Sequence, residues 1–143
     1  MLRPKFTLPL TLGLLFVFSV FVPFAQAQCS PASGTPGDDS IVCAGDDFDG
    51  ISTGTGSDTV SLVSGNVFNT IISDGGALLI LVQGGSLNTS VNFTDGVRME
   101  GDGSVDIQGD LTAGFNGIVV LGTGDILILG NVTAQQAGVT LGS

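Results

Sequence analysis

Between residues 105 and 120 the chain alternates apolar and polar side chains in short runs that glycine, asparagine and aspartate interrupt. The apolar positions are Val105, Ile107, Leu111, Ala113, Ile118 and Val120, and the polar positions are Asp106, Gln108, Asp110 and Thr112. Because successive side chains of a strand point to opposite faces, this period of two predicts short strands with one buried face. The intervening glycine, asparagine and aspartate residues predict tight turns.

The alternating pattern is part of a repeat with a period of 21 residues. GDGSVDIQGDLTAGFNGIVVLG, residues 101–122, is followed by GTGDILILGNVTAQQAGVTLGS, residues 122–143. Seven positions are identical: Gly101/Gly122, Gly103/Gly124, Ile107/Ile128, Gly109/Gly130, Thr112/Thr133, Ala113/Ala134 and Gly117/Gly138. A fixed period of this length is typical of solenoids, in which each coil pairs with the next and buries its apolar face against it.

Looser copies of the repeat precede these two. GTGSDTVSLVSGNVFNT, from Gly54, shares a G-T-G turn and a later G-N-V with GTGDILILGNVTAQ, and a slightly longer copy, DGGALLILVQGGSLNTSVNFTDGVRME, follows it. About four coils are therefore expected between residues 54 and 143. We predict an all-β fold, a parallel β-solenoid with coils of roughly 21 residues. The alternative, a β-sandwich, does not require strands that resemble one another at a fixed period.

Residues 1–27 have the layout of a secretory signal peptide. Arg3 and Lys5 precede an almost entirely apolar run over residues 8–24, and small residues stand at the −3 and −1 positions before Gln28. We predict cleavage between Ala27 and Gln28. The alternative is a membrane anchor, but the run is short for a span and contains two prolines.

Residues 28–53 are irregular and are predicted to form an N-terminal cap with one short strand over residues 40–43. Cys29 and Cys43 are the two cysteines of the chain, and in an exported protein we expect them to form a disulfide. Such a loop contributes about 3 kcal/mol to stability. A metal-binding or catalytic cysteine pair is the alternative. A lipid anchor on Cys29 is disfavoured because Gln28 precedes it where a small residue is needed.

Removal of the leader leaves a strongly acidic chain. Arg98 is then the one basic residue against thirteen acidic ones, which gives a net charge of −12. This charge repels nucleic acid and anionic membranes and attracts cations. Arg98 is expected to pair with Glu100 or Asp74.

The residues that commonly carry catalysis are nearly absent after the leader. The chain has no histidine or tyrosine and its lysine lies in the leader, so a Ser-His-Asp site is excluded. We predict no enzymatic activity. The enzymatic alternative is a β-helical polysaccharide-degrading enzyme that uses Asp38 with Asp39, or Asp46 with Asp47, as its acid and base. The lack of Trp and Tyr, which usually hold sugar rings, argues against it.

We assign no cofactor and no metal ligand, with calcium as the alternative. TGTGSDTVS, residues 53–61, matches the calcium-binding nonapeptide G-G-x-G-x-D-x-U-x at Gly54, Gly56, Asp58 and Val60. Calcium at Asp58, or in the aspartate cluster of residues 38–49, is one interpretation. The other is that Asp58 caps a tight turn.

The repeats GDGSVDIQGDLTAGFNGIVV and GTGDILILGNVTAQQAGV resemble the passenger repeats of bacterial autotransporters and related β-helical surface adhesins. PGDDSIVCAGDDFDGISTGTGSDTVSL is similar to the segment that follows the leader in such proteins, so the chain resembles the N-terminal part of that family. The resemblance implies a right-handed parallel β-helix that is exported to the bacterial surface, associates with the outer membrane and serves as a stalk or adhesive platform.

The expected partners follow from this resemblance. They are a surface receptor or a matrix polymer, and self-association through an open solenoid end is also expected. Leu127, Leu129 and the run over residues 77–82 place apolar side chains on the outward face, where a loop, a partner chain or nothing covers them. Contact with a membrane is expected only through an anchor encoded downstream.

The overlay of the repeats places Ser143 opposite Gly122, where a further coil would begin. The last residues carry none of the charged, proline-rich or polar covering that closes natural solenoids. We therefore expect the intact gene to continue with more coils and then with a membrane barrel or another anchoring domain.

Overall fold

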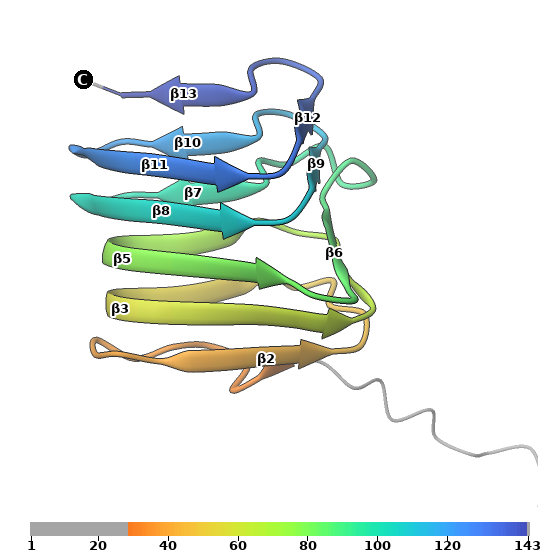
Figure 1. Ribbon diagram of the computed structural model, residues 1–143, viewed down its shortest axis with the longest axis horizontal. Coiled ribbons are helices and arrows are strands. Elements are labelled where there is room, and N and C mark those ends of the chain that lie inside the picture. The colour runs from red at the N-terminus through yellow and green to blue at the C-terminus, as the bar shows by residue number, and fades with distance from the viewer. Residues whose placement is uncertain (1–28, 143) are drawn as a thin grey trace, which may run out of the picture.

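The computed structural model describes residues 29–142, which form a parallel β-solenoid of about five coils with about 21 residues each. The strands of successive coils stack into a front, a back and a side sheet, and the front and back sheets are joined through two long strands (Figure 1). The front sheet contains β2 (Ser40–Ala44), the C-terminal halves of β3 (Ile51–Ser64) and β5 (Ile71–Val82), β8 (Gly103–Gln108) and β11 (Gly124–Leu129). The predicted all-β solenoid is confirmed.

The back sheet lies behind the front sheet, and the side sheet connects the two at one side (Figure 1). The back sheet contains the N-terminal parts of β3 and β5, followed by β7 (Val97–Met99), β10 (Ile118–Val120) and β13 (Val139–Leu141). The side sheet contains β4 (Asn66–Val67), β6 (Ser86–Asn88), β9 (Leu111–Ala113) and β12 (Val132–Ala134). The strands β3 and β5 bend around the corner between the back and front sheets, so each belongs to both (Figure 1).

Equivalent residues of successive coils lie directly above one another. Ile80 pairs with Ile107, and Ile107 pairs with Ile128, so the upper part of one inward column of the front sheet consists of isoleucine, with Val60 paired below Ile80. Leu87 and Leu111 form a matching column in the side sheet. The buried hydrophobic residues are aliphatic side chains together with Met99 and the two cysteines. Residues that recur in the sequence repeat are therefore the residues that pair between neighbouring strands of the sheets.

One coil is longer than the others. Ile71 pairs with Val97, 26 residues later, whereas Val97 pairs with Ile118, 21 residues later. Part of the additional length lies between β6 and β7, where residues 89–96 form an outward loop. The longer copy predicted from the sequence corresponds to this coil.

The parallel stacking begins within the segment expected to be the cap. The strand predicted over residues 40–43 is β2, which pairs in parallel with β3 from Ser40–Thr59 to Cys43–Leu62. The strand β3 itself runs through residues 53 and 54, where the sequence suggested that the cap ends.

The first residues of the described chain lie across the lower end of the stack. The strand β1 (Cys29–Ser30) pairs antiparallel with β2, which places Cys29 opposite Cys43. Further along, the Gly34 N–H donates to the Ser52 carbonyl at 2.6 Å, and the Thr59 N–H donates to the Asp39 carbonyl at 2.8 Å. The pairing of β1 with β2 and the Gly34 bond occupy backbone groups of the first coil that would otherwise form an open sheet edge.

A column of glycines marks the corner between the back and front sheets. Gly56, Gly76, Gly103 and Gly124 are paired in succession through the coils. A Cβ atom on Gly76, Gly103 or Gly124 would strike the carbonyl oxygen of the glycine one coil below. The backbones of neighbouring coils approach so closely at this corner that no other residue fits without displacement.

At the other end of the described chain, β11, β12 and β13 each have one paired neighbour. Ile126, Ile128 and Val132 are partly buried and pack against the core, while Leu127 and Leu129 face outward and are 51% and 59% exposed. Within residues 29–142 no helix is long and apolar enough to cross a membrane.

The glycine column predicts a position-specific effect of alanine. Gly103→Ala should lower the free energy of unfolding by about 1–3 kcal/mol, because the new methyl group forces two backbones apart. Gly138→Ala is the matched control, since a Cβ there meets no atom within 4 Å. Urea unfolding followed by circular dichroism measures both. Equal stability of the two variants would contradict the close approach at this corner.

Candidate functional site

Aspartates at the corners of the solenoid join each coil to the next. Asp102 Oδ1 accepts hydrogen bonds from the Thr123 backbone N–H at 2.7 Å and from the Thr123 hydroxyl at 2.9 Å. Asp110 Oδ1 accepts the backbone and side-chain N–H groups of Asn131 at 2.8 and 3.0 Å. Each acceptor lies one coil below its donor. These carboxylates compensate backbone N–H groups at turns where the sheet ladder is interrupted.

The same arrangement occurs at the corner between the side and back sheets, and also in the first two coils. Asp95 Oδ1 accepts from Asn116 N and Nδ2 at 3.1 and 3.0 Å, and Asp46 Oδ1 accepts from Asn66 N and Nδ2 at 2.9 and 3.1 Å. The sequence shows aspartate and asparagine at these turns, but their pairing across 20 or 21 residues was not foreseen. These carboxylates therefore serve the stacking of the coils.

The aspartate cluster of residues 38–49 is distributed over separate turns. Asp38 Oδ1 accepts the Ser57 N–H at 2.8 Å, whereas Asp39 Oδ2 accepts the backbone N–H and hydroxyl of Thr35. Asp47 is 5% exposed and accepts the N–H groups of residues 49 and 50. Each member of the pairs Asp38/Asp39 and Asp46/Asp47 thus bonds to a different backbone segment.

Asp58 lies inside the strand β3 and faces the core. It is 2% exposed, and it occupies the inward column that continues with Leu78 and Val105 in the next two coils. The interpretation that Asp58 caps a tight turn is therefore wrong, because strand alternation directs its side chain inward. Its Oδ1 accepts the Asp39 N–H at 3.0 Å, and its Oδ2 is buried without a hydrogen-bond partner among the described residues.

The described residues contain no group of three or more His, Cys, Asp or Glu side chains that could hold a metal ion. Calcium at Asp58 stays the alternative to the prediction of no metal ligand, and calorimetry with calcium on the wild type and on Asp58→Asn tests it.

The predicted disulfide is present. Cys29 and Cys43 are joined with an S–S distance of 2.09 Å, and both residues are buried. Ala27 and Gln28, which flank the predicted cleavage site, lie outside the described residues. The disulfide links the antiparallel β1 to β2 and thereby holds the capping segment against the first coil.

Arg98 in β7 forms two ion pairs. Its Nε lies 3.0 Å from Glu100 Oε1, and its Nη1 lies 3.7 Å from Asp95 Oδ2. The expected pairing with Glu100 is confirmed. The second acidic partner of Arg98 is Asp95, whereas the alternative partner named from the sequence was Asp74. The basic side chain is therefore held over the outer surface of the back sheet by acidic neighbours.

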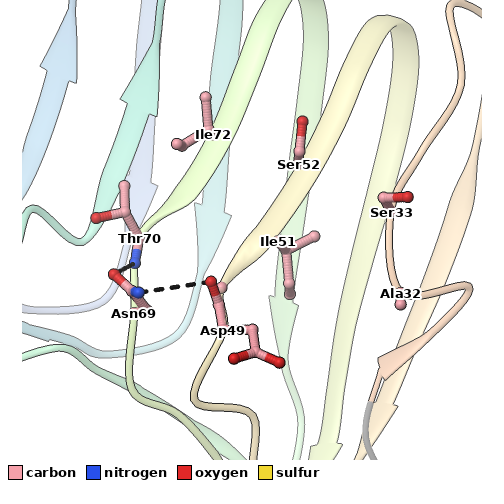
Figure 2. Close-up of a pocket in the computed structure, with 9 residues that line it drawn as sticks. Ala32, Ser33, Asp49, Ile51, Ser52, Asn69, Thr70 and Ile72 are labelled. Atoms are coloured by element: carbon pink, nitrogen blue, oxygen red, sulfur yellow. Dashed lines mark hydrogen bonds between the residues drawn. The ribbon is translucent and has the colours of Figure 1, made fainter.

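A hollow of about 280 Å³ opens where the side and back sheets meet near the cap (Figure 2). It is lined by Ala32, Ser33, Asp49, Gly50, Ile51, Ser52, Asn69, Thr70 and Ile72. Asn69 joins its two walls, since its Nδ2 donates to the Asp49 carbonyl at 3.4 Å and its Oδ1 accepts the Thr70 N–H at 2.8 Å (Figure 2). The Asp49 carboxylate accepts no hydrogen bond from the described residues, so this hollow offers an anionic group to a ligand.

Four phenylalanines follow the leader, Phe48, Phe68, Phe93 and Phe115, and we call this set the aromatic strip. Phe48 and Phe68 directly precede Asp49 and Asn69, which line the hollow. The rings of Phe48 and Phe68 stack with their centroids 4.7 Å apart. Asn92 Nδ2, in the loop of residues 89–96, donates to the Phe68 carbonyl at 2.9 Å. The Phe115 N–H donates to the Thr94 carbonyl of the same loop at 3.0 Å. One ring stack and two hydrogen bonds therefore join the segments that carry these four phenylalanines.

The outer surface of the front sheet has a second hollow of about 330 Å³, lined by residues of β3, β5 and β8. Asp106 lies there between Leu79 and Leu127 of the neighbouring coils, and its Oδ1 is covered without a hydrogen-bond partner among the described residues. The expected outward leucines are therefore present, and Leu79 and Leu127 flank one acidic side chain, Asp106.

Asp102 provides a pH-dependent test of the corner bonds. The Thr123 backbone N–H and hydroxyl hold the pKa of the Asp102 carboxyl below its ordinary value of 3.8. A lowered pKa in the folded state adds stability above the unfolded pKa, and this stability is lost as the pH falls through the folded pKa. Thr123→Val should raise the pKa of Asp102 toward 3.8 by removing the hydroxyl donor.

Carboxyl titration by NMR measures this shift. Thr133→Val, at an exposed position of β12, is the control that should leave the Asp102 midpoint unchanged. An unshifted midpoint in Thr123→Val would exclude the hydroxyl as a determinant of this pKa.

Comparisons with known proteins identify no relative of this chain. No protein-family model, no curated protein and no solved structure matches it. The functional argument therefore rests on the residues and on the geometry described above.

Proposed function

We propose that this chain is an exported structural and adhesive module of a bacterial cell surface that performs no catalysis. The observation that carries the proposal is the in-register stacking of about five coils into one parallel solenoid. Stacked coils produce length and a repetitive lateral surface, and solenoids commonly bind partners along such surfaces.

The use of the polar residues supports this proposal. The carboxylates of Asp46, Asp95, Asp102 and Asp110 accept backbone N–H groups of the next coil. They act as structural acceptors at corners, and the chain has no histidine that would complete a hydrolytic site. The leader-like residues 1–27 and the disulfide between Cys29 and Cys43 both favour an oxidising compartment outside the cytoplasm.

The outward side chains also suit a surface module. Most inward positions hold aliphatic residues because they form continuous columns, whereas outward positions vary from coil to coil. The net charge of −12 after removal of the leader keeps a protein of this kind soluble. Variable outward side chains on a repetitive frame are what an adhesive surface requires.

Expression of the full chain with its own leader in a Gram-negative host tests the export. We expect mass spectrometry to find exported protein that begins at Gln28 and contains the Cys29–Cys43 disulfide. A variant with Arg3→Glu and Lys5→Glu should stay inside the cell as the uncleaved chain, because the leader loses its basic start. Uncleaved wild-type protein in the cytoplasm would contradict the proposal.

Beads coated with the exported protein test the adhesive role. We expect them to bind cultured animal cells or extracellular matrix polymers more strongly than albumin-coated beads do. Binding no stronger than that of albumin would remove the adhesive function and leave only the structural one.

A further inference from the structure

We propose that the aromatic strip and the hollow beside it form one docking site for a polypeptide that presents an apolar segment next to a basic side chain. The inference deepens the adhesive function proposed above and rests on it. Its basis is the placement of the aromatic residues, the shape of the loop of residues 89–96 and the charge of the hollow.

All aromatic residues that follow the leader lie outside the core. The chain has nine phenylalanines and no Tyr or Trp, and the four that follow residue 27 are Phe48, Phe68, Phe93 and Phe115. Phe48, Phe93 and Phe115 are 52%, 68% and 45% exposed, and Phe68 is half-buried. Large aromatic side chains normally occupy cores or interfaces, and here the core is filled by other residues. The exposed stack of Phe48 on Phe68, with the loop of Phe93 hydrogen-bonded to Phe68, indicates an interface.

The loop that carries Phe93 is held in an uncommon conformation. Phe93 has φ of 55°, a value that bulky side chains rarely adopt. The loop is fixed by the Thr89 hydroxyl, which donates to the Thr94 carbonyl at 2.8 Å, and by the bond from Asn92 to Phe68. Such strained residues occur at binding sites when the surrounding structure holds them in place. The neighbouring Val91 is also exposed, so the loop presents apolar side chains before any partner binds.

The charge around the strip selects the partner. Asp49 follows Phe48 directly and lines the hollow with a carboxylate that accepts no hydrogen bond from the described residues (Figure 2). Asn69, which follows Phe68, lines the same hollow. An Arg or Lys side chain that entered there would meet this carboxylate while its apolar neighbours contacted the rings. A second copy of the acidic chain, with its net charge of −12, lacks this complementarity.

Three labelled decapeptides test the proposal with the exported, disulfide-bonded protein. The first has an apolar half of valine and phenylalanine and a basic half of arginine. The second replaces the arginines by glutamate, and the third replaces the apolar half by serine. We expect fluorescence anisotropy to show binding of the first peptide only, and this binding should weaken when the ionic strength rises from about 0.05 M to about 0.5 M.

Variants locate the binding on the protein. Phe48→Ser and Phe93→Ser should each weaken binding of the first peptide by about tenfold, as expected for aromatic residues central to an interface. Asp49→Asn should weaken it by about two- to fivefold, the range of an exposed ion pair. The matched controls are Leu127→Ser and Asp125→Asn, which alter exposed residues on the front sheet and should leave the affinity unchanged.

Equal binding of the arginine and glutamate peptides would overturn the proposal, and so would equal losses in the Phe48 and Leu127 variants. Thermal unfolding of each variant identifies those that are misfolded, and the two phenylalanine variants test the strip independently. If the coated beads adhere to cells but none of the peptides binds, the docking site is wrong and the adhesive function stands. If peptide binding is found without adhesion, the adhesive function fails and the docking site stands.

Discussion

The close approach of the backbone to itself, once per coil, is the constraint on which this structure depends. Neighbouring strands of a sheet lie about 4.8 Å apart, and a solenoid must keep that distance at its corners as well as along its strands. Gly76, Gly103 and Gly124 allow it at the corner between the back and front sheets, where a Cβ would strike the carbonyl of the coil below. At the turns the sheet ladder is interrupted, and the carboxylates of Asp102, Asp110 and Asp95 accept the N–H groups that it leaves.

This stacking determines which residues fit on the inward and outward faces of each strand. Inward side chains form columns in which one unsuitable residue affects two neighbours, and most of these positions hold aliphatic residues of similar size. Outward side chains have no such restriction. The phenylalanines, the hollow at Asp49 and the outward leucines all lie on the outside, so the capacity to bind partners is separate from the frame that supports it.

The repeat allowed the fold to be predicted because the residues that stack are the residues that recur. The identities between Gly103 and Gly124 and between Ile107 and Ile128 are the observed register of β8 and β11. The prediction that Asp58 caps a turn was wrong because the sequence motif around it resembles a turn. In the structure the strand β3 continues through Asp58, and the Asp39 N–H donates to its carboxylate. That contact depends on how the capping segment lies beneath the first coils, which the local pattern does not contain.

The aromatic strip was missed for a related reason. Its residues come from coils of unequal length, so no fixed period connects Phe68 with Phe93. The hollow likewise combines Ala32, Asp49 and Thr70 from three separate segments. One signal was present in the sequence, since none of the four phenylalanines occupies an inward position of the alternating pattern.

Nuclear Overhauser effects between backbone protons test the central claim, the parallel in-register stacking, most directly. The structure predicts contacts from Ile80 to Ile107 and from Ile107 to Ile128, with none between Ile80 and Ile128, since one coil separates them. The Gly109 N–H should also be protected from solvent exchange by the Leu129 carbonyl. Antiparallel cross-peaks, or contacts displaced by one residue along these strands, would contradict the stacked solenoid and the account built on it.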